Sequence, residues 1–245
     1  MIANCRSDGA RTRLERMLNA QIHNSLDLGW KKEEIFVLSN FPYAYMGVDS
    51  IEASLNDFCL TGSKMFGVRW LMNFLADVPT IWAHDLDAWQ NAPFDEPEFK
   101  DVGIAQYSNS KYNGGSVFWR RDALDIVEAI CNAIVAGNLQ REEPTLNGVL
   151  KSKDYKDRVT VVNNTFNVGC SGYVVRVNRS DKPLRVCHFH PDNRIAWETH
   201  ALDRNEIGEI GITVRLERLI RQYYPKLATK VVTKKKPLTD GRERK

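Results

Sequence analysis

Two carboxylates stand two residues apart, at Asp85 and Asp87, directly after the apolar run of residues 80–84. That run predicts a strand, and in extended chain residues i and i+2 share a face with their Cα atoms about 6.5 Å apart. Two anions so close repel each other unless positive charge lies between them, and a divalent cation supplies it most simply. The pair therefore predicts a metal site. The alternatives are that the acids solvate a loop or that Asp85 caps a turn.

A pair of histidines, His188 and His190, ends a second predicted strand, residues 185–189, later in the chain. Alternation along a strand puts both imidazoles on one face, so either could bind the same metal. A mixed set of carboxylates and imidazoles favours Mn²⁺ over Mg²⁺, because Mg²⁺ prefers shells made of oxygen. The alternative is a pair of polar side chains at a strand edge.

Two further groups have residue types that suit a reaction site. Asn113, Gly114 and Gly115 precede an apolar run, and glycines there permit a tight turn or the close approach of backbone to a ligand. Glu142 and Glu143 stand just before a predicted helix. They either complement the positive end of the helix dipole or present a carboxylate to a reaction centre. For the glycines, the alternative is an ordinary turn.

The elements that must position these residues alternate between strands and helices. Apolar residues three and four apart predict helices at residues 11–29, 62–76, 122–135, 144–150 and 211–224. Short apolar runs predict strands at residues 34–39, 80–84, 102–107, 157–162, 173–177 and 185–189. Residues 112–119 are expected to form a glycine turn that leads into a short strand. This order is typical of an α/β fold with a mostly parallel central sheet flanked by helices. Ligands of such sheets bind at the carboxyl ends of the strands, which is where Asp85 and Asp87 fall.

Composition excludes several classes of protein. The chain has 245 residues, of which 43% are hydrophobic and 27% charged, enough for one large folded domain or two small ones. No stretch approaches the ~20 apolar residues of a membrane span, and the first residues lack the apolar core of a signal peptide. The five cysteines are scattered without CxxC spacing, which argues against a disulfide framework and a cysteine zinc site. We therefore expect a cytoplasmic protein.

Charge is distributed unevenly along the chain. Residues 230–245 carry seven basic and two acidic side chains, hence +5, while the other 229 residues carry 27 basic and 29 acidic ones, hence −2. We expect a single domain over residues 1–229 and a flexible basic tail that either meets a polyanion such as DNA or is simply solvated. A noncatalytic nucleic-acid-binding module would predict a basic body. A two-metal phosphoesterase would need more ligands than these acids and histidines.

The order of the motifs resembles the Rossmann-like glycosyltransferase-A fold. A strand-end Asp-x-Asp is followed by Asn-Gly-Gly at 113–115, by Glu-Glu-x-Thr-Leu-Asn from Glu142, and by a late histidine element. More narrowly, the chain is similar to the small retaining enzymes of the glycogenin and lipopolysaccharide galactosyltransferase type. The segment His-Asp-Leu-Asp-Ala-Trp, which begins at His84, also resembles bacteriophage glycosyltransferases, some of which attach sugars to hydroxymethylated DNA bases.

The late motif of that family reads HxxGxxKPW, and its histidine helps to hold the metal. In this chain His188 matches the histidine and Arg194 stands at the lysine that contacts the diphosphate. Pro191 replaces the glycine, and Trp197 comes one position late. Arginine can bind a phosphate with two parallel hydrogen bonds, so Arg194 can make the phosphate contact that the lysine makes in the family.

The resemblance implies a transferase that moves a hexose or pentose from a nucleoside diphosphate sugar, most commonly a UDP-sugar. Asp85, Asp87 and His188 would hold Mn²⁺ or Mg²⁺. The residues that would bind the nucleotide-sugar donor are Asn4, Arg6, Asp8, Lys64, Asp85, Gly114, Gly115 and Arg194. For Lys64 the alternative is a solvated helix lysine.

The acceptor side would be formed by Asn113, Glu142 and Glu143. One of the two glutamates would be the base in an inverting enzyme, or would steady positive charge at the sugar in a retaining one. Residues 1–100 would bind the nucleotide sugar and residues 101–200 the acceptor, and the helix at residues 211–224 would close the domain. The acceptor would be a hydroxymethylated pyrimidine of phage DNA, or alternatively a glycan or protein.

Overall fold

The structure is a computed structural model. It describes the whole chain except residues 6, 55–62, 109–110, 138–141, 203–210 and 226–245, and only the backbone of Ser108 and Arg194. The expectations for Arg6 and for the basic tail from residue 230 lie outside the described residues. Among the residues described, no helix combines the length and the apolar character needed to cross a membrane.

Three sheets form the centre of the molecule. The first has the strand order β1-β2-β4-β3, with β1 (Ile2–Ala3), β2 (Val37–Ser39) and β4 (Val48–Glu52) parallel and β3 (Ala44–Tyr45) antiparallel to β4. Helix α1 (Asp8–Asp27) connects β1 to β2 as the crossover that a parallel pair requires.

The second and third sheets are mixed. The second has the order β5-β8-β7-β9, where β5 (Thr80–His84) and β7 (Val102–Ser108) run antiparallel to β8 (Lys111–Arg120), and β9 (Val159–Val161) is parallel to β7. In the third, β11 (Val186–His188) lies between the parallel β10 (Val168–Gly169) and the antiparallel β6 (Ala88–Gln90).

The predicted α/β fold class is confirmed, but its strands are more mixed than the expected mostly parallel sheet. Among the residues that the structure describes, four strand pairs are parallel and four are antiparallel. Only two residues separate β7 from β8, too few for a parallel crossover, so the two strands pair antiparallel.

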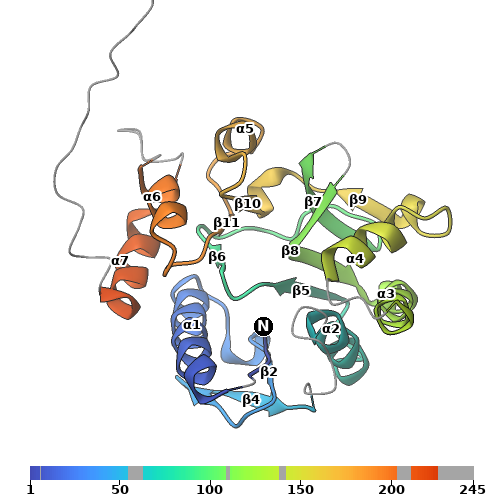
Figure 1. The fold of residues 1–245 in the computed structure, drawn as a ribbon, viewed down its shortest axis with the longest axis horizontal. Coiled ribbons are helices and arrows are strands. Elements are labelled where there is room, and N and C mark those ends of the chain that lie inside the picture. The colour runs from blue at the N-terminus through green and yellow to red at the C-terminus, as the bar shows by residue number, and fades with distance from the viewer. Residues whose placement is uncertain (6, 55–62, 109–110, 138–141, 203–210, 226–245) are drawn as a thin grey trace, which may run out of the picture.

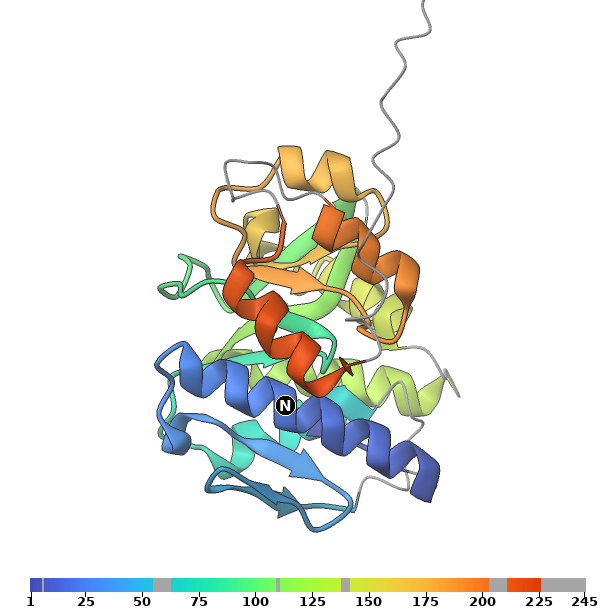
Figure 2. The same cartoon turned by 90° about the vertical axis from the view of Figure 1, so that its left-hand side faces the viewer.

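Helices cover the sheets from two sides, and each side has its own core (Figures 1 and 2). On one side α2 (Ser63–Phe74), α3 (Leu124–Ala136) and α4 (Glu142–Leu150) pack with β7 and β8 around the buried Trp119. On the other side α1 and α7 (Val214–Tyr223) pack against β6 and β11 around Trp89. The chain also forms α6 (Arg194–Leu202) and the 3-10 helices Lys32–Glu34, Arg121–Ala123, Lys156–Arg158 and Asn164–Phe166.

Two local predictions are wrong. Residues 173–177 were expected as a strand because of their valines, but they form α5 (Tyr173–Asn178), which begins after Gly172 in the left-handed region. Only one side of that short helix is buried, and Val174 and Val175 are exposed. The Asn113-Gly114-Gly115 segment is not a turn but part of the long strand β8. Of the two glycines, Gly115 faces His188 at the end of β11, which belongs to the third sheet.

Candidate active site

The turn from β5 to β6 carries both acidic residues and is fixed by backbone hydrogen bonds on two sides. Asp85 N donates to Gly115 O of β8 (2.9 Å), and Ala88 N donates to Asp85 O (3.0 Å). Phe189 N, just after β11, donates to Asp87 O (2.9 Å). Asp85 is thereby anchored to the second sheet and Asp87 to the third, so the carboxylates stand where two sheets meet.

A buried glutamine of α1 supports the same turn. Gln21 Nε2 donates to Leu86 O (2.8 Å) and to Ala88 O (3.1 Å), and the side chain is 1% exposed. A buried side-chain amide whose two N–H donors are both used in this way holds the turn against movement. Sequence reasoning missed Gln21, since a single polar residue on an amphipathic helix gives no signal of its own.

His188 joins the two carboxylates in one cluster. Its Nε2 lies 3.2 Å from Asp87 Oδ1 and 3.8 Å from Asp85 Oδ2, and one ligand atom from each of the three residues falls within 4.8 Å of the others. Neighbouring ligand atoms, each about 2.1 Å from one ion, stand about 3 Å apart. The spacing and the donor set of two carboxylates and one imidazole therefore suit a divalent ion such as Mn²⁺.

The far side of the His188 ring fixes its orientation. His188 Nδ1 lies 3.2 Å from Asn167 Oδ1, and Asn167 Nδ2 donates to Asn113 O (3.3 Å). A proton on Nδ1, donated to the Asn167 oxygen, leaves the Nε2 lone pair facing the carboxylates, as a metal ligand needs. Asn167 was missed by sequence reasoning, because no spacing ties it to the histidine.

The His188–Asp87 contact also changes both pKa values. Burial alone would lower the pKa of His188, but the hydrogen bond and the charge of Asp87 outweigh it, so this pKa lies above its ordinary value. Burial would raise the pKa of Asp87, and His188 instead holds it below its ordinary value. When it is protonated, His188 compensates part of the acidic charge, a role that a bound cation can take over.

Gly115 makes room for that imidazole. A Cβ at this position would lie 2.2 Å from His188 Cε1 and 2.4 Å from His188 Nδ1. The same Cβ at Gly114 would meet Glu142 Oε1 at 3.6 Å and Lys64 Nζ at 3.8 Å, which are ordinary contacts. One glycine is therefore required by the cluster, while its neighbour is not.

Lys64 at the start of α2 is the buried cation of the site. Its Nζ contacts Asp85 Oδ1 (2.7 Å), Gly114 O (2.8 Å) and Glu142 Oε1 (3.1 Å). Burial alone would lower the pKa of Lys64, but the charges of Asp85 and Glu142 more than reverse this and place it above its ordinary value. The alternative of a solvated helix lysine is therefore wrong. Asp85 uses one oxygen for Lys64 and turns the other toward His188.

The two glutamates of α4 have different surroundings. Glu142 is buried against Lys64, and burial raises its pKa to about 7. Glu143 accepts a hydrogen bond from the hydroxyl of Tyr107 (3.2 Å), at the end of β7. Burial, with the nearby charge of Glu143, raises the pKa of Tyr107 to about 12, so the hydroxyl stays a donor. Tyr107 is a third residue that the sequence did not single out.

These residues line one cleft of about 710 Å³, a volume within the range of ligand sites. Of the residues predicted for the site, the cleft brings together Asn4, Lys64, Asp85, Asp87, Asn113, Gly114, Gly115, Glu142, Glu143 and His188. The described residues of its lining include four carboxylates, whereas the side chains that can carry positive charge are one lysine and His188. The other histidine of the lining, His84, stays neutral, because burial lowers its pKa to about 4. The cleft thus has an excess of negative charge that favours a divalent cation.

The other predicted residues lie elsewhere. Asp8 is exposed in the first turn of α1 and is not part of the lining, so its predicted contact with the nucleotide is not seen. His190 lies against Arg13 of α1 and near Asp192, outside the cluster. Arg194 begins α6, and its side chain lies outside what the structure describes. Its contact with a diphosphate remains a prediction.

Solved structures similar to this one are glycosyltransferases. The galactosyltransferase LgtC, solved with donor and acceptor sugar analogues, has a TM-score of 0.58 at 14% identity, over 90% of this chain and 95% of the neighbour. A glycosyltransferase involved in glycosylation of the major capsid of PBCV-1 has a TM-score of 0.50 at 12% identity, over 82% and 97%. GlyE of Streptococcus pneumoniae TIGR4 has a TM-score of 0.51 at 12% identity, over 92% and 63%.

No family model matches the sequence, and no curated protein matches it either. The structural likenesses, spread over most of the chain, confirm the glycosyltransferase-A fold that the motifs predicted.

We expect Gly115→Ala to weaken Mn²⁺ binding at least about tenfold, because the added methyl group must displace His188 from the carboxylates. Gly114→Ala is the matched control, and its Mn²⁺ affinity should stay close to that of the unchanged protein. Electron paramagnetic resonance of free Mn²⁺ during a titration measures both. Equal Mn²⁺ affinities for the two variants would contradict the role assigned to Gly115.

We expect His188→Ala to lower Mn²⁺ affinity by about a hundredfold, while His190→Ala leaves it nearly unchanged. The reason is that His188 lies in the cluster and His190 contacts Arg13 and Asp192 instead. Calorimetric titration with MnCl₂ compares the two. Loss of binding in His190→Ala with normal binding in His188→Ala would show that the wrong histidine has been assigned.

Proposed function

We propose that this chain is a metal-dependent glycosyltransferase that moves a sugar from a nucleoside diphosphate sugar, most commonly a UDP-sugar, to a hydroxyl acceptor. The observation that carries the proposal is the pairing of the Asp85–Asp87–His188 cluster with the buried Lys64 in one cleft. Such a cleft offers a cation site and a fixed positive charge next to each other, as binding of a diphosphate requires.

The residues of the cluster would hold Mn²⁺ or Mg²⁺ through Asp85 Oδ2, Asp87 and His188. When bound, the cation would neutralise the charge that develops on the departing diphosphate. The three contacts of Lys64 match the three N–H donors of an ammonium group, so we infer that it positions Asp85 and Gly114 and adds charge at the donor. Asn4 in the lining and Arg194 at the start of α6 would contact the rest of the donor.

On the acceptor side, Glu143 is the carboxylate that we favour for the reaction. Glu142 is committed to Lys64, whereas Glu143 lines the cleft and has Tyr107 as its hydrogen-bond donor. In an inverting reaction Glu143 would take the proton of the acceptor hydroxyl. In a retaining reaction it would steady positive charge at the sugar's anomeric carbon. Asn113 and Gly115 would border the transferred sugar.

Two classes of acceptor have support. The basic segment of residues 230–245 suits a polyanion, and with it a hydroxymethylated pyrimidine in DNA. The likeness to a glycosyltransferase involved in capsid glycosylation favours a protein or glycan instead. A DNA acceptor would make transfer strongly salt-dependent, because phosphate contacts weaken as salt rises.

The decisive assay incubates the protein with Mn²⁺ and a panel of nucleotide sugars, and measures release of the nucleoside diphosphate. We expect turnover with at least one donor, and a loss of about 10²- to 10³-fold in Asp87→Asn, because the substitution removes a charged ligand. The exposed Asp154 provides the control, and Asp154→Asn should keep full activity.

Hydroxymethylated DNA, unmodified DNA, oligosaccharides and a protein mixture serve as acceptors over a salt series in the same assay. Transfer to hydroxymethylated DNA alone would identify the DNA acceptor. Absence of turnover with every donor, together with DNA binding, would favour the noncatalytic module over the transferase. Full activity in Asp87→Asn or in chelator would contradict the metal role.

A further inference from the structure

A buried arginine stands behind the tyrosine that contacts Glu143. Arg176 of α5 is 5% exposed, and its guanidinium carbon lies 4.3 Å from the centre of the Tyr107 ring. Among the residues that the structure describes, no carboxylate lies within ion-pair distance of this guanidinium. A buried charge without a carboxylate partner costs stability, and proteins accept such a cost most often at functional sites.

Local features of two strands hold the guanidinium on the ring. A Cβ at Gly169 of β10 would lie 2.8 Å from Arg176 Nη1, so the missing side chain makes room for the guanidinium. The register between β7 and β8 shifts on both sides of Gln106, and irregularities of this kind redirect the side chains of a strand. Tyr107 follows Gln106 directly, and its ring lies against Arg176.

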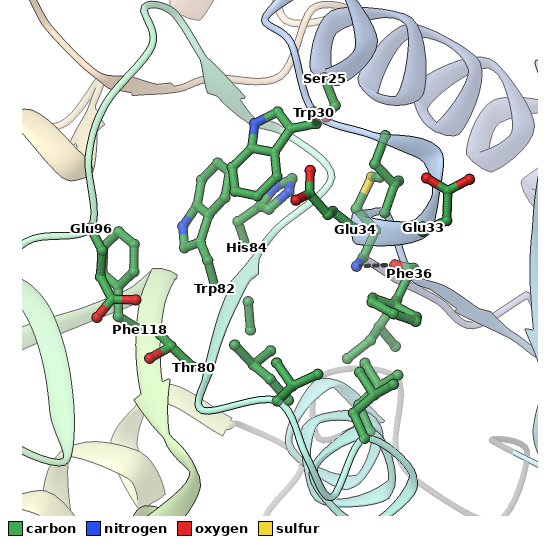
Figure 3. A pocket seen from close by; sticks show the side chains of 18 of the residues that line it. Ser25, Trp30, Glu33, Glu34, Phe36, Thr80, Trp82, His84, Glu96 and Phe118 are labelled. Carbon is green, nitrogen blue, oxygen red and sulfur yellow. Dashed lines mark hydrogen bonds between the residues drawn. The ribbon is translucent and has the colours of Figure 1, made fainter.

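Arg176 does not reach the substrate space of the cleft directly. The lining of the cleft includes Tyr107 and Glu143 but not Arg176. Another cavity, of about 360 Å³, has largely apolar walls that include Trp30 and Trp82, and Arg176 is not part of them either (Figure 3). Any effect of Arg176 on a reaction in the cleft must therefore pass through Tyr107.

Tyr107 connects the arginine to Glu143. Its hydroxyl donates to Glu143 Oε2 (3.2 Å), while its ring faces the guanidinium. A cation over an aromatic ring is attracted by the π electrons, which fixes the ring and makes the hydroxyl a stronger donor. Burial lowers the pKa of Arg176, but Tyr107 and Glu143 act in the opposite direction, so the three groups interact electrostatically as well.

Each glutamate of α4 is thus linked to a buried cation of its own. Lys64 contacts Glu142 directly at 3.1 Å, whereas Arg176 is linked to Glu143 through one aromatic ring. The direct contact commits Glu142 to Lys64. The indirect link orders Glu143 without a direct ion pair to Arg176, which leaves its carboxylate available to a substrate.

We propose that Arg176 is a positioning residue of the transfer reaction: through the ring of Tyr107 it holds the tyrosine hydroxyl on Glu143 and fixes the direction of that carboxylate. This role rests on the proposed function, in which Glu143 faces the acceptor hydroxyl or the anomeric carbon of the sugar. Because Arg176 lies outside the lining of the cleft, its loss should lower the rate of transfer and leave donor and metal binding intact.

The kinetic test compares three variants of the full chain. Arg176→Met removes the charge but keeps a flexible apolar side chain that suits a buried position, and Arg176→Lys keeps a cation that can lie over the ring. Arg179→Met, at an exposed arginine that ends the same helix, is the matched control. We expect Arg176→Met to lower kcat about tenfold or more with unchanged KM for the donor and unchanged Mn²⁺ affinity, because only the reacting carboxylate is misdirected. Arg176→Lys should recover most of the rate, and Arg179→Met should lose none.

A double-mutant cycle shows whether the arginine acts through the hydroxyl of Tyr107. Tyr107→Phe keeps the ring and removes the donor, so adding Arg176→Met to it should cost little further rate. Losses that simply multiply in the double variant would overturn the proposal. Loss of Mn²⁺ affinity in Arg176→Met that matches its loss of kcat would show a structural role alone and would overturn it as well.

Nuclear magnetic resonance tests the same link without turnover. In protein labelled with ¹³C at the Cζ atom of tyrosine, the Tyr107 signal is identified by its loss in Tyr107→Phe. Glu143→Gln should shift this signal, and the shift should fall to less than half when Arg176→Met is present. Equal shifts in the two backgrounds would overturn the proposal. If the unchanged protein turns over no donor, the proposed function fails, and this comparison still decides whether Arg176 holds Tyr107 on Glu143. If Arg176→Met does not fold, Arg176→Gln removes the same charge and takes its place.

Discussion

The site depends on one electrostatic constraint: two carboxylates fixed two residues apart need positive charge beside them. Backbone hydrogen bonds tie Asp85 to β8 and Asp87 to the end of β11, so the pair cannot separate to relieve its repulsion. Lys64 contacts one side of Asp85 and His188 stands between Asp85 and Asp87. Much of the local sequence serves this arrangement, from the missing side chain at Gly115 to the amide of Asn167 behind the imidazole. The remaining negative charge is what a divalent cation would neutralise.

The sequence predicted which of these residues lie together better than it predicted the strands around them. The Asp-x-Asp spacing was enough to pair Asp85 with Asp87, although they lie in the turn between β5 and β6 and not in extended strand. The family motif was enough to bring in His188. Alternation could not choose between the histidines, because β11 ends at His188 and the chain then carries His190 toward Arg13 of α1. Such a change of direction depends on tertiary contacts that no local pattern encodes.

Other features were beyond the sequence for related reasons. Gln21, Tyr107 and Asn167 support the site through contacts to residues far away in the chain, so spacing could not reveal them. The valines of α5 favour a strand intrinsically, but the packing of one helical side prevails over that propensity. The glycines at 114 and 115 suggested a turn because they were considered alone. The real constraint applies to Gly115 alone, and it is the imidazole of His188 that approaches from β11.

The central claim is that the cluster and Lys64 together form a site for a metal and a diphosphate. Calorimetric titration of the protein with UDP, once with saturating Mn²⁺ and once with chelator, tests it most directly. The account predicts that Mn²⁺ tightens UDP binding at least about tenfold, and that UDP tightens Mn²⁺ binding by the same factor, because the two effects are thermodynamically linked. Equal UDP affinity with and without Mn²⁺ would contradict the account.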